Sequence, residues 1–311
     1  MELSFLLFQK IISMALIMLM GYAIRKTGTV KDEQTPIISA LLLYILVPCM
    51  VFNSFLRPFS QERFQAFVLA MVSMFTAQLI FILLAWLLGK TPLRFDSTEQ
   101  ACIAYTNCGN LLIPLINSML GPEYVFYSVP FLAANTICAW IHIPALISGE
   151  CKPDFRKILL NPAILSIIAG IVFFCFGITL PGIIADTITG VANSVGIVSM
   201  LLTGMLMAGI DLKGVFSNPR YLGVSFVRLI MFPMLLVLIL ALTGLTHRSD
   251  MYREVLMVMV MSGAAPTATV VIMMTNLFGG KAELASAISA MTTILCIITL
   301  PVVVYFYQLL C

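Results

Sequence analysis

The feature that most constrains this chain is a succession of long apolar runs separated by short polar connections. A helix needs about 20 apolar residues to cross a hydrocarbon core about 30 Å thick. Only 10% of the residues are charged, whereas an ordinary soluble domain carries about 25% charged residues. The sequence therefore predicts an all-α polytopic membrane protein. The apolar runs predict ten spans, at residues 4–24, 36–56, 64–89, 100–119, 123–148, 161–178, 188–210, 219–244, 252–277 and 284–308.

Lysine and arginine predict how these spans are oriented. The connections after the first, third, fifth, seventh and ninth spans carry eleven of the 17 Lys and Arg residues, and the opposite connections carry five. By the positive-inside rule, the first set is cytoplasmic and both termini are extracytoplasmic. The remaining cation, Arg228, lies inside a span. The N-terminus has no basic region ahead of its first apolar run, so we expect a retained helix and not a cleaved signal.

The spans divide into two sets of five around a short cytoplasmic loop at residues 149–160. The first half covers residues 1–148 and the second half covers residues 161–311, and each enters the membrane in the opposite sense. This inverted repeat is typical of many secondary transporters. A cytoplasmic membrane of a bacterium is the expected location, and the lipid bilayer is the expected surrounding.

Two spans contain polar and helix-breaking residues where an uninterrupted apolar helix would be expected. One holds the sequence TNCGNLLIPLINSMLG from Thr106 to Gly121, and the other holds SGAAPTAT around Pro266. A kink at each proline is the simplest interpretation. Pro114 and Pro266 are 152 residues apart, however, so two unwound points at matching places could cross and satisfy each other's backbone groups. Half-helices beginning there would direct free N–H groups and positive dipole ends into one small space, which suits an anion.

The two interruptions therefore predict a substrate site where they meet, with several polar residues as candidates for binding the substrate. Asn107 and Asn110 can offer amide donors to a carboxylate or tie neighbouring helices together. Asn135 and His142 either line the cavity or are satisfied polar residues of the core, and we favour the second. Arg228 could bind a carboxylate, pair with a backbone carbonyl or snorkel to the cytoplasmic face. The complete candidate set is Asn107, Gly109, Asn110, Pro114, Asn135, His142, Arg228, Ala265, Pro266 and Thr267.

Other classes of function lack their residues. Neither a nucleophile with its base nor a set of paired carboxylates is evident at membrane depth, so an enzyme is not expected. The chain holds two histidines, far apart, and its eight cysteines form no C-x-x-C pair, so we expect no metal and no cofactor. A basic cluster for nucleic acid is also missing. An anion channel or a membrane sensor of a small organic acid remains the alternative, because broken half-helices also build pores.

The sequence resembles the auxin efflux carrier family, which includes malonate and malate permeases and is related to the plant PIN auxin exporters. Four segments carry the resemblance. They are N-x-G-N-L-x-I-P-L at 107–115, R-L-x-x-x-P at 228–233, A-A-P-T-A at 264–268 and S-A-M-T-T-I-L-C-I-I-T-L-P at 289–301. The segment LVPCMVFNSF at 46–55 is similar to the family's second span.

This resemblance implies ten helices in two inverted five-helix repeats, with the fourth and ninth helices broken and crossing. It implies a scaffold of spans 1, 2, 6 and 7, forming a homodimer through spans 2 and 7. The other six spans would form a transport domain that moves past this scaffold in an elevator-type mechanism. The implied partner is a small organic anion, a mono- or dicarboxylate.

Overall fold

The structure is a computed structural model that describes residues 2–149 and 155–311. Its regular structure is helical throughout the described residues, apart from one isolated bridge between Thr106 and Thr267. The helices before the central connection are α1 (Glu2–Lys26), α2 (Thr35–Leu41), α3 (Val47–Phe55), α4 (Gln61–Lys90), α5 (Ser97–Ala104), α6 (Ile113–Met119) and α7 (Pro122–Ser148). Those after it are α8 (Phe155–Leu159), α9 (Pro162–Phe176), α10 (Gly182–Met207), α11 (Leu212–Ser217), α12 (Pro219–Phe226), α13 (Phe232–Thr243), α14 (Asp250–Gly263), α15 (Thr269–Phe278) and α16 (Ala282–Leu310).

Five short segments complete the helical structure. Two are single 3₁₀ turns, and three are π-helical segments inserted between α-helices. The 3₁₀ turns are η1 (Asp32–Gln34) and η5 (Leu245–His247). The π-helical segments are η2 (Leu42–Leu46), η3 (Cys108–Leu112) and η4 (Val227–Met231).

Helical structure lies within every one of the ten predicted ranges, but helix length divides these ranges into two groups. Within the described residues, 7 helices are long and apolar enough to cross a membrane by length and composition. They are Phe8–Lys26, Thr35–Phe55, Gln61–Lys90, Pro122–Ser148, Gly182–Met207, Pro219–Thr243 and Ala282–Leu310. The other three predicted spans hold shorter apolar helices, Cys108–Met119, Pro162–Phe176 and Thr269–Phe278. The prediction of a multi-pass membrane protein is confirmed to this extent, whereas the ten-span inverted repeat is not.

One helix starts away from its predicted boundary, and the central connection contains an additional short helix. Helix α10 begins at Gly182, several residues before the predicted start, because the polar residues Asp186 and Thr187 interrupt the apolar run without interrupting the helix. The predicted loop at 149–160 contains the short helix α8 at Phe155–Leu159. Residues 150–154 of that loop lie outside the described residues.

Each π-helical segment ends two residues before a proline. Pro48 follows η2, Pro114 follows η3 and Pro233 follows η4. Proline has no N–H, and its ring clashes with the carbonyl four residues earlier. A wider π turn moves that carbonyl away from the ring while the helix continues. These prolines therefore widen their helices locally and do not break them.

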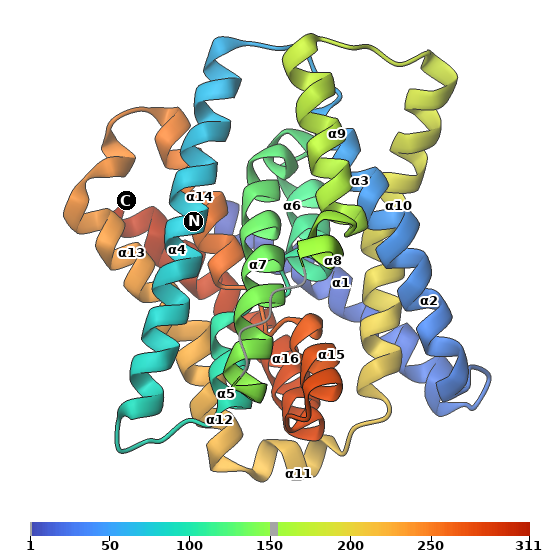
Figure 1. Ribbon diagram of the computed structural model, residues 1–311, viewed down its shortest axis with the longest axis vertical. Coiled ribbons are helices and arrows are strands. Elements are labelled where there is room, and N and C mark those ends of the chain that lie inside the picture. The colour runs from blue at the N-terminus through green and yellow to red at the C-terminus, as the bar shows by residue number, and fades with distance from the viewer. Residues whose placement is uncertain (1, 150–154) are drawn as a thin grey trace.

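The helices pack into two groups that Figure 1 shows side by side. Helices α2, α3, α9 and α10 lie along the right side of the view, while α4, α13 and α14 lie on the left with α7 near the middle. Helix α1 joins the first group through a close contact with α10, where Gly21 faces the backbone of Leu201 and Gly204 faces the backbone of Met18. A side chain at either glycine would collide with the opposite backbone, so glycine sets this close approach.

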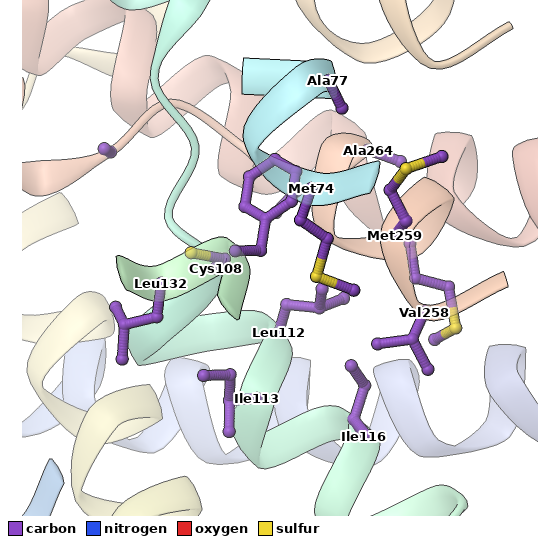
Figure 2. Packing of buried hydrophobic residues seen from close by; sticks show 14 of the residues in the cluster. Met74, Ala77, Cys108, Leu112, Ile113, Ile116, Leu132, Val258, Met259 and Ala264 are labelled. Carbon is purple, nitrogen blue, oxygen red and sulfur yellow. The ribbon is translucent and has the colours of Figure 1, made fainter. Parts of the chain in front are cut away.

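A large apolar core cluster surrounds the first of the two non-helical interruptions. Figure 2 shows side chains meeting there from the middle of α4, from η3 with α6, from α7 and from the end of α14. Met74, Cys108 and Ala264 are each fully buried in this cluster. The core places the interruption in an apolar interior, where every polar group needs a partner within the protein.

Candidate functional site

The first interruption lies between α5 and η3. Helix α5 ends at Ala104, and Tyr105 adopts an extended conformation with φ −109° and ψ 132°. Asn107 then turns the chain into η3 at Cys108, with φ −82° and ψ 51°. It lies at the start of the segment predicted to be interrupted, Thr106 to Gly121, beside the candidate residue Asn107. Pro114 lies further on, near the start of α6, because a π turn absorbs the effect of the proline.

The second interruption lies between α14 and α15, where the prediction around Pro266 is confirmed. Helix α14 ends at Gly263 and α15 begins at Thr269, and residues 264–268 between them are not helical. Pro266 has no N–H and disfavours a helical conformation at Ala265. The sequence of this segment therefore stops one helix before another begins.

The two interruptions pair with each other through their backbones. Thr106 and Thr267 form an isolated antiparallel bridge. The N–H of Asn107 donates to the carbonyl of Pro266 at 2.7 Å, and the N–H of Ala268 donates to the carbonyl of Tyr105 at 3.0 Å. As expected from the cost of unsatisfied backbone groups in an apolar interior, each interruption satisfies part of the other.

Side chains from neighbouring helices hold the centre of each interruption. Asn135 of α7 forms two hydrogen bonds with the backbone of Thr106. Its Oδ1 accepts from the Thr106 N–H and its Nδ2 donates to the Thr106 carbonyl, both at 3.1 Å. Thr292 of α16 plays a similar part in the other half, because its hydroxyl accepts from the Thr267 N–H at 3.1 Å. Asn135 is buried and fully engaged, so it has the role of a satisfied core residue.

Two further side chains cover the carbonyl ends of the broken helices. Gln78 of α4 donates from Nε2 to the Ala104 carbonyl at 3.2 Å, at the end of α5. Arg228 of η4 donates from Nη2 to the carbonyls of Gly263 and Ala265, both at 2.8 Å, at the end of α14. Each donor comes from the third predicted span of its half. The negative end of each broken helix is thereby masked.

Arg228 is completely buried, and its environment decides between the three predicted roles. Its guanidinium lies 5.4 Å from the centre of the Phe81 ring, a cation–π arrangement. The pairing with backbone carbonyls is observed, while full burial rules out snorkelling to the membrane surface. Its Nε and Nη1 have no hydrogen-bond partner among the described residues. Arg228 therefore brings a positive charge to the interruption from behind its backbone.

The half-helices that start at the interruptions have uncapped positive ends. Neither η3, which begins after Asn107, nor α15, which begins after Ala268, has a capping side chain. Asn110 and Thr269 lie in the first turns of these two segments and approach each other, with Nδ2 and Oγ1 3.5 Å apart. Both side chains are partly exposed, whereas residues 264–268 are buried. The first N–H groups of two helices thus converge where polar side chains remain accessible.

The remaining candidates lie at different distances from this point. Gly109 lies in η3, and a methyl group there would be 3.0 Å from the Leu132 side chain, so the position is tightly packed. Pro114 lies against Gly196 of α10 and not at the interruption. His142 of α7 reaches the site through Tyr105, whose hydroxyl lies 3.0 Å from His142 Nδ1.

A small apolar cavity lies beside η3, between the two groups of helices. Its volume is about 30 Å³, room for about two water-sized spheres. Residues of α1, η3, α6, α10 and α16 line it, among them Met14, Leu111, Leu115, Met200 and Cys296. A carboxylic acid of several carbons needs more space than this, so these two groups would have to separate to admit one.

Tyr105, Gln78 and Thr292 were not predicted from the sequence, although each holds part of an interruption. Gln78 could have been predicted as a capping group, because it is a polar residue within the apolar run 64–89. Thr292 lay inside a segment used only for the family resemblance. Tyr105 carries no such signal, because an aromatic residue in an apolar run is ordinary.

The fold and the paired interruptions define a multi-pass α-helical membrane protein built from two related halves. The membrane transport protein family matches residues 6–154 and again residues 151–304. The chain belongs to this family, which is the auxin efflux carrier family, and it contains two copies of the family's unit. It is therefore a membrane transport protein and not an enzyme. No match to a curated protein was found.

Proposed function

We propose that this protein is a secondary transporter of a small organic anion, a mono- or dicarboxylate, that binds where the two interruptions meet. The proposal rests on a difference between the two kinds of helix end at the interruptions: the carbonyl ends accept hydrogen bonds from side chains, and the N–H ends have no capping side chain. Gln78 and Arg228 cover the carbonyl ends of α5 and α14, while the N–H ends of η3 and α15 have no capping side chain. The uncovered charge is therefore positive, which favours a carboxylate.

In this proposal Asn110 and Thr269 contact the anion, because they are the accessible polar side chains of the two converging helix starts. Asn107, Gly109, Ala265, Pro266 and Thr267 shape the backbone around it. Asn135 and Arg228 act from behind, through Thr106 and through the carbonyls of Gly263 and Ala265. Pro114 affects the site only indirectly, because it maintains the π turn of η3 that orients Asn110.

Transport would follow an elevator-type alternating-access path. The ten spans would form two inverted repeats, residues 1–148 and 161–311, joined by the cytoplasmic loop 149–160. The scaffold would comprise α1, α2, α3, α9 and α10, and the moving domain would comprise α4–α7 and α12–α16. Support comes from the packing of these two groups and from the small cavity between them. The resemblance supports a homodimer through spans 2 and 7 in a cytoplasmic membrane, with both termini extracytoplasmic.

The test is counterflow of labelled malonate, malate, succinate, lactate and indole-3-acetate in proteoliposomes, run with a thermal-shift assay on the purified protein. We expect one acid to exchange saturably and to stabilise the folded state by about 2.7 kcal/mol at a hundred times its dissociation constant. Asn110→Ala should abolish both effects, because it removes the accessible amide at the helix starts. Asn117→Ala, in α6 and partly exposed, is the matched control and should keep them.

Two results would contradict the proposal. Stabilisation by a neutral or cationic solute, with no response to the five acids, would contradict the proposal that the substrate is an anion. Anion current without exchange of labelled substrate would indicate a channel.

A further inference from the structure

A histidine and a tyrosine form a hydrogen-bonded pair beside the first interruption, and the proposed function leaves this pair without a role. The Tyr105 hydroxyl donates to the backbone carbonyl of Cys138 at 3.1 Å and lies 3.0 Å from Nδ1 of His142. The backbone carbonyl of the same Tyr105 accepts from Ala268 in the second interruption. A single residue thus connects His142 to the pairing of the two interruptions.

The hydrogen bonds determine which nitrogen of His142 carries the proton. A hydroxyl has one hydrogen, and a carbonyl can only accept, so the Tyr105 hydrogen is used on Cys138. Both contacts are hydrogen bonds only if Nδ1–H of His142 donates to the Tyr105 oxygen. Neutral His142 then presents Nε2 as a free lone pair. Adding a proton at Nε2 forms one N–H bond and disturbs none of these hydrogen bonds.

The surroundings of His142 make this nitrogen a candidate for proton binding. His142 is partly exposed. Among the elements that pack against α7, α6 and α15 carry no titratable side chain, and Glu99 of α5 is held by Arg220. The other titratable groups of those elements and of α7 are Cys49, Glu62, Arg63, Lys90, Cys102, Cys108, Glu123, Tyr124, Tyr127, Cys138, Arg156, Lys157, Cys175, Asp250, Tyr252, Arg253 and Glu254.

We propose that His142 is the proton-binding residue of this carrier, so that the anion crosses the membrane together with a proton. The proton adds to Nε2 from the water on one side and leaves to the water on the other, and no other bond changes. An imidazolium beside the interruption offsets the charge of the anion, and the bound anion favours the imidazolium. Coupling of this kind lets a proton gradient drive the anion against its own gradient. The inference rests on the proposed function only for the identity of the coupled solute.

The first experiment reads the protonation of His142 directly. The chain has two histidines, and His247 lies exposed in η5, so the full-length His247→Gln variant leaves His142 as the one imidazole. Nitrogen-15 NMR of this variant in nanodiscs should show Nδ1 protonated throughout and Nε2 gaining a proton between about pH 8 and pH 5. Malonate, malate or succinate should move that midpoint to higher pH. An Nε2 that stays unprotonated down to pH 5, with and without these acids, would overturn the proposal whatever the protein transports.

The second experiment measures coupling in proteoliposomes. An inward proton gradient should raise the accumulation of labelled malonate, malate or succinate in the wild type and in His247→Gln. In His142→Gln the gradient should give no accumulation above the value without a gradient. Tyr105→Phe should shift the nitrogen-15 signals of His142, because Nδ1–H loses its acceptor.

The two experiments separate the two proposals. Titration of His142 without any counterflow of the five acids would contradict the proposed function and leave the proton site standing. Counterflow with gradient-driven accumulation that persists in His142→Gln would contradict the proton site and leave the proposed function standing.

Discussion

At the scale of single residues, a buried arginine side chain forms hydrogen bonds to backbone carbonyls at the end of a broken helix. A buried charge costs several kcal/mol unless it is paired and hydrogen-bonded, and Arg228 is fully buried. It contacts the carbonyls of Gly263 and Ala265, where α14 ends and its dipole is negative. Arg228 therefore stabilises the break in the helix while keeping a positive charge near the proposed anion.

Replacing this charge should affect stability and transport together. Arg228→Gln removes a charge-assisted donor from two buried carbonyls, so we expect the free energy of unfolding to fall by about 3 kcal/mol and transport to fall with it. Arg228→Lys keeps the charge and should be intermediate. Denaturation in detergent and uptake at equal membrane abundance measure the two effects. Full transport by Arg228→Gln would show that the charge is not needed.

At the scale of helices, prolines have two different effects that depend on what lies nearby. Pro266 lies where α14 has ended and contributes to a true interruption. Pro114, Pro48 and Pro233 instead follow π-helical segments within continuing helices. The polar sequence around Asn107, together with the hydrogen bonds from Asn135, lets the chain leave the helix before Pro114 is reached.

This difference predicts an effect of Pro114→Ala on the site and not on the fold. Alanine supplies the missing N–H for the carbonyl of Asn110, so η3 can tighten toward an α-helix. Losing the extra residue of the π turn would rotate Asn110 by about 100° relative to α6. We expect the melting temperature to be kept or raised and the stabilisation by the transported acid to be lost.

Pro48→Ala is the matched control, because it relaxes η2 away from the interruptions. It should keep the thermal response to the acid. A full response in Pro114→Ala would mean that the π turn does not place Asn110.

At the scale of the whole molecule, ion pairs tie together the two halves of the six-span group. Arg220 of α12 contacts both carboxylate oxygens of Glu99 at the start of α5, and the Glu99 side chain is only 3% exposed. Lys281, between α15 and α16, pairs with Asp96 at 2.7 Å, but the Lys281 side chain is well exposed and that of Asp96 is partly exposed. Water weakens an exposed pair much more than a buried one. We therefore infer that the Arg220 pair, and not the Lys281 pair, holds these helices together as one body.

The two pairs should respond differently to loss of their cations. Arg220→Gln leaves the buried Glu99 without its partner, and we expect the free energy of unfolding to fall by about 2 kcal/mol, less than for a fully buried pair because Arg220 is partly exposed. Lys281→Gln should produce no measurable change. Chemical denaturation of both variants in detergent checks this, and equal losses would contradict the inference.

The amount that could be predicted differs between the fold and the site. Hydrophobic runs located the helices well, because in a membrane the apolar length of a segment and its helical structure have the same cause. Run length placed α9 to within two residues at each end but did not reveal that α10 begins early, since the start of a helix depends on local capping and loop geometry. At the site, Pro266 located one interruption, and the polar residues from Thr106 to Asn110 located the other, eight residues before Pro114.

The sequence by itself determined that this is a multi-pass helical membrane protein with two unusual polar segments, because apolar length and polar exceptions are local properties of the chain. Its two copies of one family unit are also a property of sequence. Only the tertiary structure decided that Thr106 pairs with Thr267, that Asn135 and Arg228 support the backbone from behind, and that Tyr105 connects His142 to the site. These contacts join residues from separate helices, and the packing of the helices alone brings them within hydrogen-bond distance.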